Sequence, residues 1–203
     1  YRVFVEQELL SHEEAWRYNI AKTRGYDPFR FVRYQLFIQV MLNGRDEPLP
    51  GFQTDPYLRY LLGTMDAAGV RYLVVRNHQD FEHRHWQLVE RGEMPARFAL
   101  RGESPQMVPY SVYENKAYLP RAYLLGDTEA LSVADPSLNA RLSKLEPRKL
   151  LLVEKSAQLK EPQQSFQQAT IIDYSPTRIV VEAELDSPGY LVLCDIYSPG
   201  WTA

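Results

Sequence analysis

Residues 169–203 constrain the fold more than any other part of the chain, because short strand-like segments are separated there by turns that contain proline. The turns lie at residues 175–177, 186–189 and 198–200. Between the first two turns, apolar residues occupy every second position, which places them on one face of a β-strand. These positions are Ile179, Val181, Ala183 and Leu185. Short strands joined by regular turns are typical of a sandwich, so we predict a mostly antiparallel β-sandwich for the C-terminal half.

The N-terminal half has a different pattern, in which helical and strand-like segments alternate. Residues 1–5 and 70–75 are predicted strands, and the second is rich in β-branched and aromatic residues, as expected inside a sheet. Helices are predicted at residues 12–20, 29–42 and 56–67. Residues 77–95 are polar and poorly patterned. We therefore predict an α+β chain, with a small αβ layer at residues 1–100 followed by the sandwich at residues 101–203.

Shorter segments fill the region between the two halves. Strands are predicted at residues 112–115 and 122–125, and one or two more within residues 98–108. Residues 135–145 have the pattern of a surface helix or an irregular excursion, and residues 150–153 are apolar. Residues 157–164 are a predicted polar linker.

The composition excludes several classes of protein. The chain has 23 basic and 26 acidic residues and a net charge of -3, which differs from the strongly basic surface of a nucleic-acid-binding protein. Its longest apolar runs are far shorter than the roughly 20 residues that span a bilayer, so no membrane span is predicted within it. The single cysteine, Cys194, excludes an intrachain disulfide and lies in an apolar run. We interpret it as a small buried hydrophobic residue.

No catalytic or metal-binding motif is predicted. The His83-Arg84-His85 sequence would place two imidazoles on one face of a strand, but a third ligand at a clear spacing is missing, so a solvated loop is the simpler interpretation. Glu182 and Glu184 share a predicted exposed face, whereas glycosidases need paired carboxylates with one raised pKa. The sequence has no phosphate-binding loop, dinucleotide fingerprint or nucleophile elbow. We therefore predict no catalytic residue, no metal site and no cofactor.

Three blocks of the sequence contain residue patterns that a helix or strand alone does not require. They are residues 61–75 (LLGTMDAAGVRYLVV), residues 115–125 (NKAYLPRAYLL) and residues 169–203, which contain YSPTRIVV and PGYLVLCDIYSPGWTA. In order and spacing, these blocks resemble a pattern of the YfhO family of bacterial polytopic membrane proteins. The most specific part is the Pro-Gly-Trp block with Asp195 before it.

The resemblance implies that many transmembrane helices precede this region in a longer protein. The fold of that protein is expected to be similar to the GT-C class of lipid-sugar-dependent glycosyltransferases, with its catalytic acid in an early extracytoplasmic loop outside this sequence. In the family the chain continues past the Trp-x-Ala motif into further strands, so we expect a sandwich that is truncated at its C-terminus. The resemblance thus implies an extracytoplasmic domain that is tethered by transmembrane helices and whose partner is the membrane-embedded part of the same polypeptide.

Four residues are candidates for ligand binding. They are Arg121, Asp195, Tyr197 and Trp201. Asp195 interrupts an apolar strand, and it either contacts a ligand or the membrane part, or accepts hydrogen bonds from amides of the turn at residues 197–201. Arg121 follows Pro120 and forms either an ion pair within the domain or a contact with an anionic lipid-linked substrate. The sequence leaves both alternatives open.

Three functional hypotheses follow from these residues. The first is a non-catalytic accessory domain that packs against a membrane-embedded glycosyltransferase core, which requires an exposed apolar patch. The second is a carbohydrate-binding module, in which a glycan or lipid-linked sugar stacks on an aromatic ring, with Trp16, Trp86 and Trp201 as candidate platforms. The third is a glycan hydrolase, which requires two facing acids in a pocket.

Overall fold

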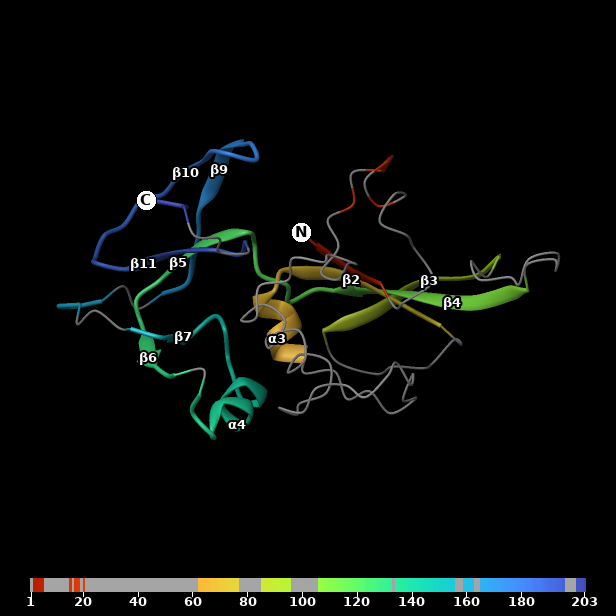
Figure 1. Ribbon diagram of the computed structural model, residues 1–203, viewed down its shortest axis with the longest axis horizontal. Coiled ribbons are helices and arrows are strands. Elements are labelled where there is room, and N and C mark those ends of the chain that lie inside the picture. Colours follow the sequence, from red (N-terminus) through yellow and green to blue (C-terminus); the bar gives the residue numbers. More distant parts are fainter. Residues whose placement is uncertain are drawn as a thin grey trace. The chain divides into compact units, whose positions relative to one another are not determined.

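The computed structural model places its described residues in two compact units (Figure 1). The described residues are 2–5, 15, 17, 18, 20, 62–76, 85–95, 106–132, 134–155, 159–162, 165–195 and 200–203. Unit 1 comprises those within Tyr1–Pro28 and Ala68–Tyr118, and unit 2 those within Phe29–Ala67 and Leu119–Ala203. Strands dominate both units, so the predicted α+β class with a mostly antiparallel, sandwich-like β part is confirmed.

Unit 1 is a four-stranded mixed sheet with the order β1-β2-β4-β3. Its strands are β1 (Arg2–Val5), β2 (Val70–Arg76), β3 (Trp86–Pro95) and β4 (Met107–Asn115). β1 runs parallel to β2, whereas β4 pairs antiparallel with both β2 and β3. The two strands predicted in the N-terminal half are therefore confirmed as neighbours in one sheet.

The position of β2 inside this sheet follows from its sequence. Val70, Leu73 and Val75 are buried, and β-branched residues pack well on a pleated surface. Gly69 precedes the strand with a φ of 68°, a left-handed conformation that glycine adopts without steric cost. Its carbonyl accepts a hydrogen bond from the amide of Arg2 at 2.8 Å, which joins the start of β1 to the start of β2.

The long strand β3 was missed by the sequence pattern, which described residues 77–95 only as polar and poorly patterned. Almost all side chains of β3 after the buried Trp86 are exposed or half-exposed, so the strand has no alternation of apolar and polar residues. Pairing with β4 forms it instead. Because β4 pairs with β2 and β3, unit 1 extends to Tyr118, and the two units do not follow the expected boundary at residue 100.

The main sheet of unit 2 is antiparallel and consists of short strands. β11 (Tyr190–Leu193), β5 (Ala122–Leu125) and β8 (Gln167–Gln168) pair in that order, and β9 (Thr170–Tyr174) pairs with β10 (Ile179–Glu182). The amide of Ala169, between β8 and β9, donates to the carbonyl of Ala122 at 3.1 Å. The chain therefore passes directly from the β8 ladder into the β9–β10 hairpin.

Each face of this sheet has its own apolar cluster. We call one the Tyr123 face, where Leu119, Tyr123, Leu125 and Leu151 are buried. Val153, Phe166, Tyr190, Val192 and Cys194 pack against them. We call the other the Leu124 face, where Ala122, Leu124 and Ala169 are buried and Ile171, Val181 and Leu193 pack against them. The predicted alternation holds for Ile179 and Val181, but β10 ends at Glu182, so Ala183 and Leu185 lie outside the strand and are exposed.

A second layer covers the Tyr123 face. It contains β6 (Thr128–Ala130) and β7 (Leu151–Val153), which are parallel. The segment between them in the sequence holds the short helix α4 (Leu138–Ser143) (Figure 1). β7 supplies Leu151 and Val153 to the apolar cluster on that face. Of the two alternatives for residues 135–145, the structure shows a helix, α4, and the apolar segment at residues 150–153 contains the strand β7.

Several remaining predictions concern single elements. The third predicted helix is confirmed at its C-terminal end by α3 (Leu62–Ala67), in which Met65 is fully buried. Cys194 is half-buried, and its thiol donates to the carbonyl of Ala67 at 3.3 Å. The predicted helix at residues 29–42 and most of that at residues 12–20 lie outside the described residues.

Candidate functional site

A bulge in β9 decides which side chains share the Leu124 face. Val181 pairs with Ile171 and Ile179 pairs with Tyr174, so three residues on β10 correspond to four on β9. Directly opposite residues of an antiparallel pair project from the same face, and an extra residue reverses the alternation of its strand. Tyr174 therefore projects from the Leu124 face together with Ile171.

The ends of two other strands meet at the same place. Arg121 directly precedes β5 and Asp195 follows β11. The amide of Cys194 donates to the carbonyl of Arg121 at 2.8 Å, which extends the β11–β5 ladder by one pair. The backbone thus places Arg121 and Asp195, which are 74 residues apart in the sequence, side by side.

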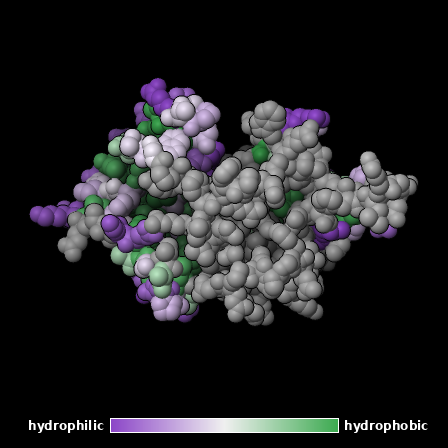
Figure 2. Space-filling view, in the orientation of Figure 1, coloured by the Kyte–Doolittle hydropathy of each residue, from purple (hydrophilic) through white to green (hydrophobic). Residues whose placement is uncertain are grey.

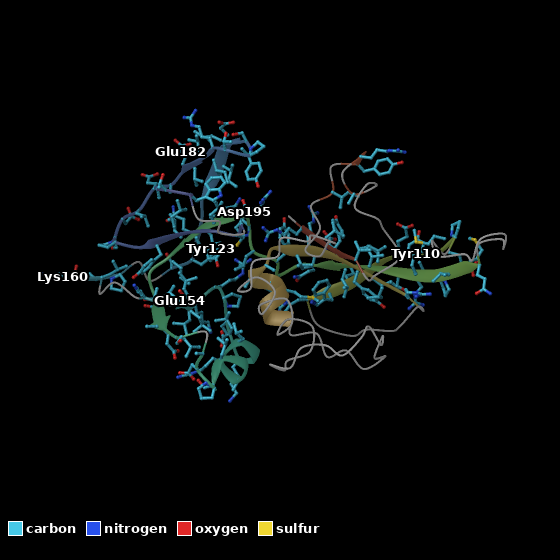
Figure 3. The ribbon with its side chains drawn as sticks, viewed as in Figure 1. Tyr110, Tyr123, Glu154, Lys160, Glu182 and Asp195 are labelled. Carbon is cyan, nitrogen blue, oxygen red and sulfur yellow. The ribbon has the colours of Figure 1, made fainter. Side chains whose placement is uncertain are left out.

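Arg121, Tyr174 and Asp195 form a closed set of contacts, which we call the Arg121 cluster. Arg121 Nη2 donates to Asp195 Oδ1 and to Tyr174 Oη, the latter at 2.7 Å. The Tyr174 hydroxyl donates to Asp195 Oδ2 at 3.2 Å. The guanidinium carbon also lies 4.4 Å from the centre of the Tyr174 ring, within the range of a cation–π contact. Figure 3 shows Asp195 below the hairpin that carries Tyr174.

The contacts within the cluster favour the protonated, positively charged form of Arg121. Burial alone lowers the pKa of Arg121, but the Asp195 carboxylate and the Tyr174 hydroxyl outweigh this effect and raise the pKa above its ordinary value. The side chains of Arg121 and Asp195 are 23% and 20% exposed, so water screens the pair only partly. Arg121 Nε is buried and has no hydrogen-bond partner in the part of the chain that the structure describes. Asp195 thus neutralises a largely desolvated guanidinium.

The cluster resolves one of the two alternatives for Arg121, since the ion pair within the domain is confirmed. A contact of Arg121 with an anionic lipid-linked substrate stays a prediction. Asp195 was predicted to bind amides of the turn at residues 197–201, of which residues 197–199, including Tyr197, lie outside the described residues. Tyr174 was not among the predicted site residues, because a bulge that turns its side chain toward Asp195 has no signal in the sequence.

The tryptophans predicted as sugar platforms differ in exposure. Trp86 is buried in unit 1, which corrects its prediction as a platform, because a buried ring offers no face to a ligand. Trp201 is 38% exposed and follows Gly200, whose φ of 113° suits glycine. Trp16 lies outside the described residues. Trp201 is therefore the one of the three that the structure supports as an accessible aromatic surface.

The carboxylates and histidines considered for catalysis or metal binding are arranged as follows. Glu182 and Glu184 are exposed, as predicted. His85 is described, whereas His78 and His83 lie outside the described residues. Within the described ranges, no group of three or more His, Cys, Asp or Glu side chains is placed to hold a metal ion.

Unit 1 holds a second charged cluster that the sequence did not indicate. Arg71 Nε and Nη2 both donate to Glu114 Oε1, at 3.1 and 3.0 Å, and Lys116 pairs with the other carboxylate oxygen. The Arg71 guanidinium also lies over the rings of Tyr72 and Tyr118. Hydrogen bonds from Lys116 and then from Arg71 lower the pKa of Glu114. Both oxygens of Glu114 thus have internal partners, which indicates a structural role.

No protein-family model, no curated protein and no solved structure matches this chain. Among the described residues, no helix combines the length and the apolar character needed to cross a membrane.

Proposed function

We propose that this chain is a non-catalytic extracytoplasmic domain of a multi-pass bacterial membrane protein. It packs against the membrane-embedded part of the same polypeptide, which resembles a lipid-sugar-dependent glycosyltransferase. The proposal begins from the sequence resemblance to the YfhO family. In it, the Arg121 cluster holds the strand ends in place, and the surface beside the cluster binds the membrane-embedded part.

The observation that carries the proposal is the distribution of exposed apolar side chains in unit 2. Among the described residues of unit 2, the large hydrophobic side chains that are exposed all lie within residues 172–201. They are Ile172, Tyr174, Leu185, Leu191 and Trp201. Figure 2 shows hydrophobic residues beside hydrophilic ones where the C-terminal strands reach the surface. Exposed apolar side chains that concentrate in one segment of the chain favour an interaction surface there.

Leu191 defines the direction in which this surface faces. It pairs directly with Leu124 and therefore projects from the Leu124 face. Leu124 itself is fully buried, whereas Leu191 on the neighbouring strand is 49% exposed. Tyr174, which is 50% exposed, projects from the same face on β9. The centre of the Leu124 face is thus covered and its margins are exposed, which leaves apolar area for a further layer.

Site-specific photocrosslinking in the full-length membrane protein tests the proposal. A photoreactive phenylalanine analogue replaces Leu191, and the matched control carries it at the exposed Glu154 of the same unit (Figure 3). We expect crosslinks from position 191 to an extracytoplasmic loop or transmembrane segment of the same polypeptide, and none from position 154. Equal crosslinking at both positions, or no crosslink to the membrane-embedded part, would contradict the proposal.

A carbohydrate-binding module is the second candidate, and the exposure of Tyr174 and Trp201 favours it. Aromatic rings that are partly exposed offer the apolar faces on which sugars stack. Calorimetric titration of the chain with cell-envelope glycans distinguishes the two candidates. Saturable binding that is lost in Trp201→Ala would establish a recognition module, whereas no heat of binding to any glycan favours the accessory domain.

A further inference from the structure

The strand β3 of unit 1 has the features of a sheet edge. Among the described strands it pairs on one side only, with β4. Side chains on both of its faces are exposed over most of its length, and Leu88 and Val89 are 40% and 48% exposed. An exposed edge presents backbone amides and carbonyls in a row, which favours pairing with another strand.

The backbone between the bulge and the end of β3 is regular and held flat against β4. The register shifts between Leu88 and Glu90 and is then continuous as far as Pro95. Tyr110 on β4 donates to Glu90 at 2.7 Å, and its ring lies so close to Gly92 that a Cβ there would be 2.8 Å from the Tyr110 hydroxyl (Figure 3). The ring therefore fills the space beside the glycine and supports the edge at residues 90–94.

The charges on this segment are complementary to themselves in one antiparallel arrangement. Directly opposite residues of an antiparallel pair either both point their backbone groups at the partner strand or both point them away. Neighbouring residues of one strand point their backbone groups in opposite directions. Two identical strands related by a twofold axis can therefore pair only if the axis passes between a residue and the same residue of the other copy. An axis through Gly92 places Arg91 of each copy opposite Glu93 of the other. Both side chains are exposed, so this register brings two pairs of opposite charges close together.

We propose that β3 is a self-association site, at which two copies of this chain pair their β3 strands antiparallel about Gly92. The two four-stranded sheets then form one continuous sheet, and the two Arg91–Glu93 pairs set its register. This inference rests on unit 1 alone and is independent of the function proposed from unit 2.

Sedimentation velocity of the full chain over a range of concentrations tests the proposal. We expect a reversible dimer in the unmodified protein. Arg91→Glu and Glu93→Arg each place like charges opposite one another in both pairs, and each should raise the dimer dissociation constant about tenfold. The combined variant with both substitutions restores opposite charges and should return the constant to nearly its original value.

Two controls separate this effect from changes in overall charge or folding. Glu154→Arg and Lys160→Glu change the net charge equally at exposed positions of unit 2 and should leave association unchanged (Figure 3). Circular dichroism checks that each variant is folded, as expected for exposed side chains. A protein that stays monomeric at every concentration overturns the proposal. A dimer that is insensitive to the single substitutions, or that the double substitution fails to restore, overturns it equally.

Discussion

The four-stranded sheet of unit 1 and the short-stranded sheets of unit 2 are stabilised in different ways. In unit 1, β3 and β4 are ten and nine residues long, and their ladder extends over most of both strands. In unit 2, β5, β10 and β11 have four residues each. A short strand contributes few backbone hydrogen bonds, so the unit 2 sheet depends more on side chains, namely apolar clusters on both faces and the Arg121 cluster at the strand ends.

The two units also differ in how deeply the polar contacts at their strand ends are buried. In unit 1 the fully buried Asn115 is the last residue of β4. Its amide nitrogen donates to the carbonyl of Val70 at the start of β2 at 3.0 Å, and its oxygen accepts from the amide of Ala117 at 2.9 Å. In unit 2 the polar cluster lies at the margin of the sheet and is partly exposed. Polar contacts therefore fix strand ends in both units, but the contact is fully buried in unit 1 and partly exposed in unit 2.

The largest expected effect tests whether the two cores are separate. Leu124→Ala removes a fully buried side chain from unit 2 and should lower its free energy of unfolding by about 2–5 kcal/mol. Hydrogen exchange should accelerate in β5, β9 and β11 while β2 and β4 keep their protection. The control Leu191→Ala, at a half-exposed position of the same face, should change stability by less than about 1 kcal/mol. Equal acceleration in both units would show that they unfold as one.

The second test concerns the buried amide of unit 1. Asn115→Ala leaves the carbonyl of Val70 and the amide of Ala117 without this partner and should cost about 1–3 kcal/mol. Denaturant unfolding measures the loss. Asn115→Asp keeps the acceptor for Ala117 but removes the donor to Val70. If the alanine variant is as stable as the unmodified chain, the hydrogen bonds of Asn115 do not stabilise unit 1.

The third test concerns the strand ends of unit 2. Asp195→Asn leaves the partly buried guanidinium of Arg121 without its counter-charge and should cost about 1–2 kcal/mol, reduced from the value for a fully buried pair because water reaches both side chains. Tyr174→Phe removes one hydroxyl and should cost about 1 kcal/mol. The exposed pair of Arg141 and Glu129 is the matched control, and Glu129→Gln should change stability by less. Equal effects at both pairs would refute a special role for the Arg121 cluster.

The smallest expected effect is a difference in acid sensitivity. Because its pKa is lowered in the folded chain, Glu114 contributes stability that is fully present above its unfolded-state pKa of about 4.3 and is lost as pH falls through its folded-state pKa. Acid titration of the Glu114→Gln variant, followed by hydrogen exchange in β2 and β4, should show a weaker decline of protection below pH 4.3 than in the unmodified chain. Identical acid profiles of the two proteins would contradict this.

Local sequence pattern predicted the elements that bury an apolar face. The strand β2 follows from its β-branched run, and β5 and β11 follow from short apolar segments between turns. The strand β3 did not follow, because its exposed polar side chains carry no alternation and only its partner β4 determines it. Pairing between distant segments is not encoded in either segment alone, which is why unit 1 extends beyond the expected boundary.

The candidate site was only partly predictable, because it also depends on pairing between distant segments. Arg121 and Asp195 were predictable as site residues because each is a charged residue beside an apolar strand. The antiparallel pairing of those strands brings the two side chains together. Tyr174 completes the cluster through a one-residue bulge in β9, which depends on the register with β10. A sequence pattern reports which side chains are polar, but the register decides which of them meet.

The central claim is that the margins of the Leu124 face bind the membrane-embedded part of the same polypeptide. The most direct measurement compares amide hydrogen exchange of this region in the isolated chain and in a longer protein that includes the proposed membrane-embedded part. The claim predicts slower exchange in β10 and β11 of the longer protein, with β6 and β7 unchanged. Equal exchange of β10 and β11 in the two proteins would contradict it.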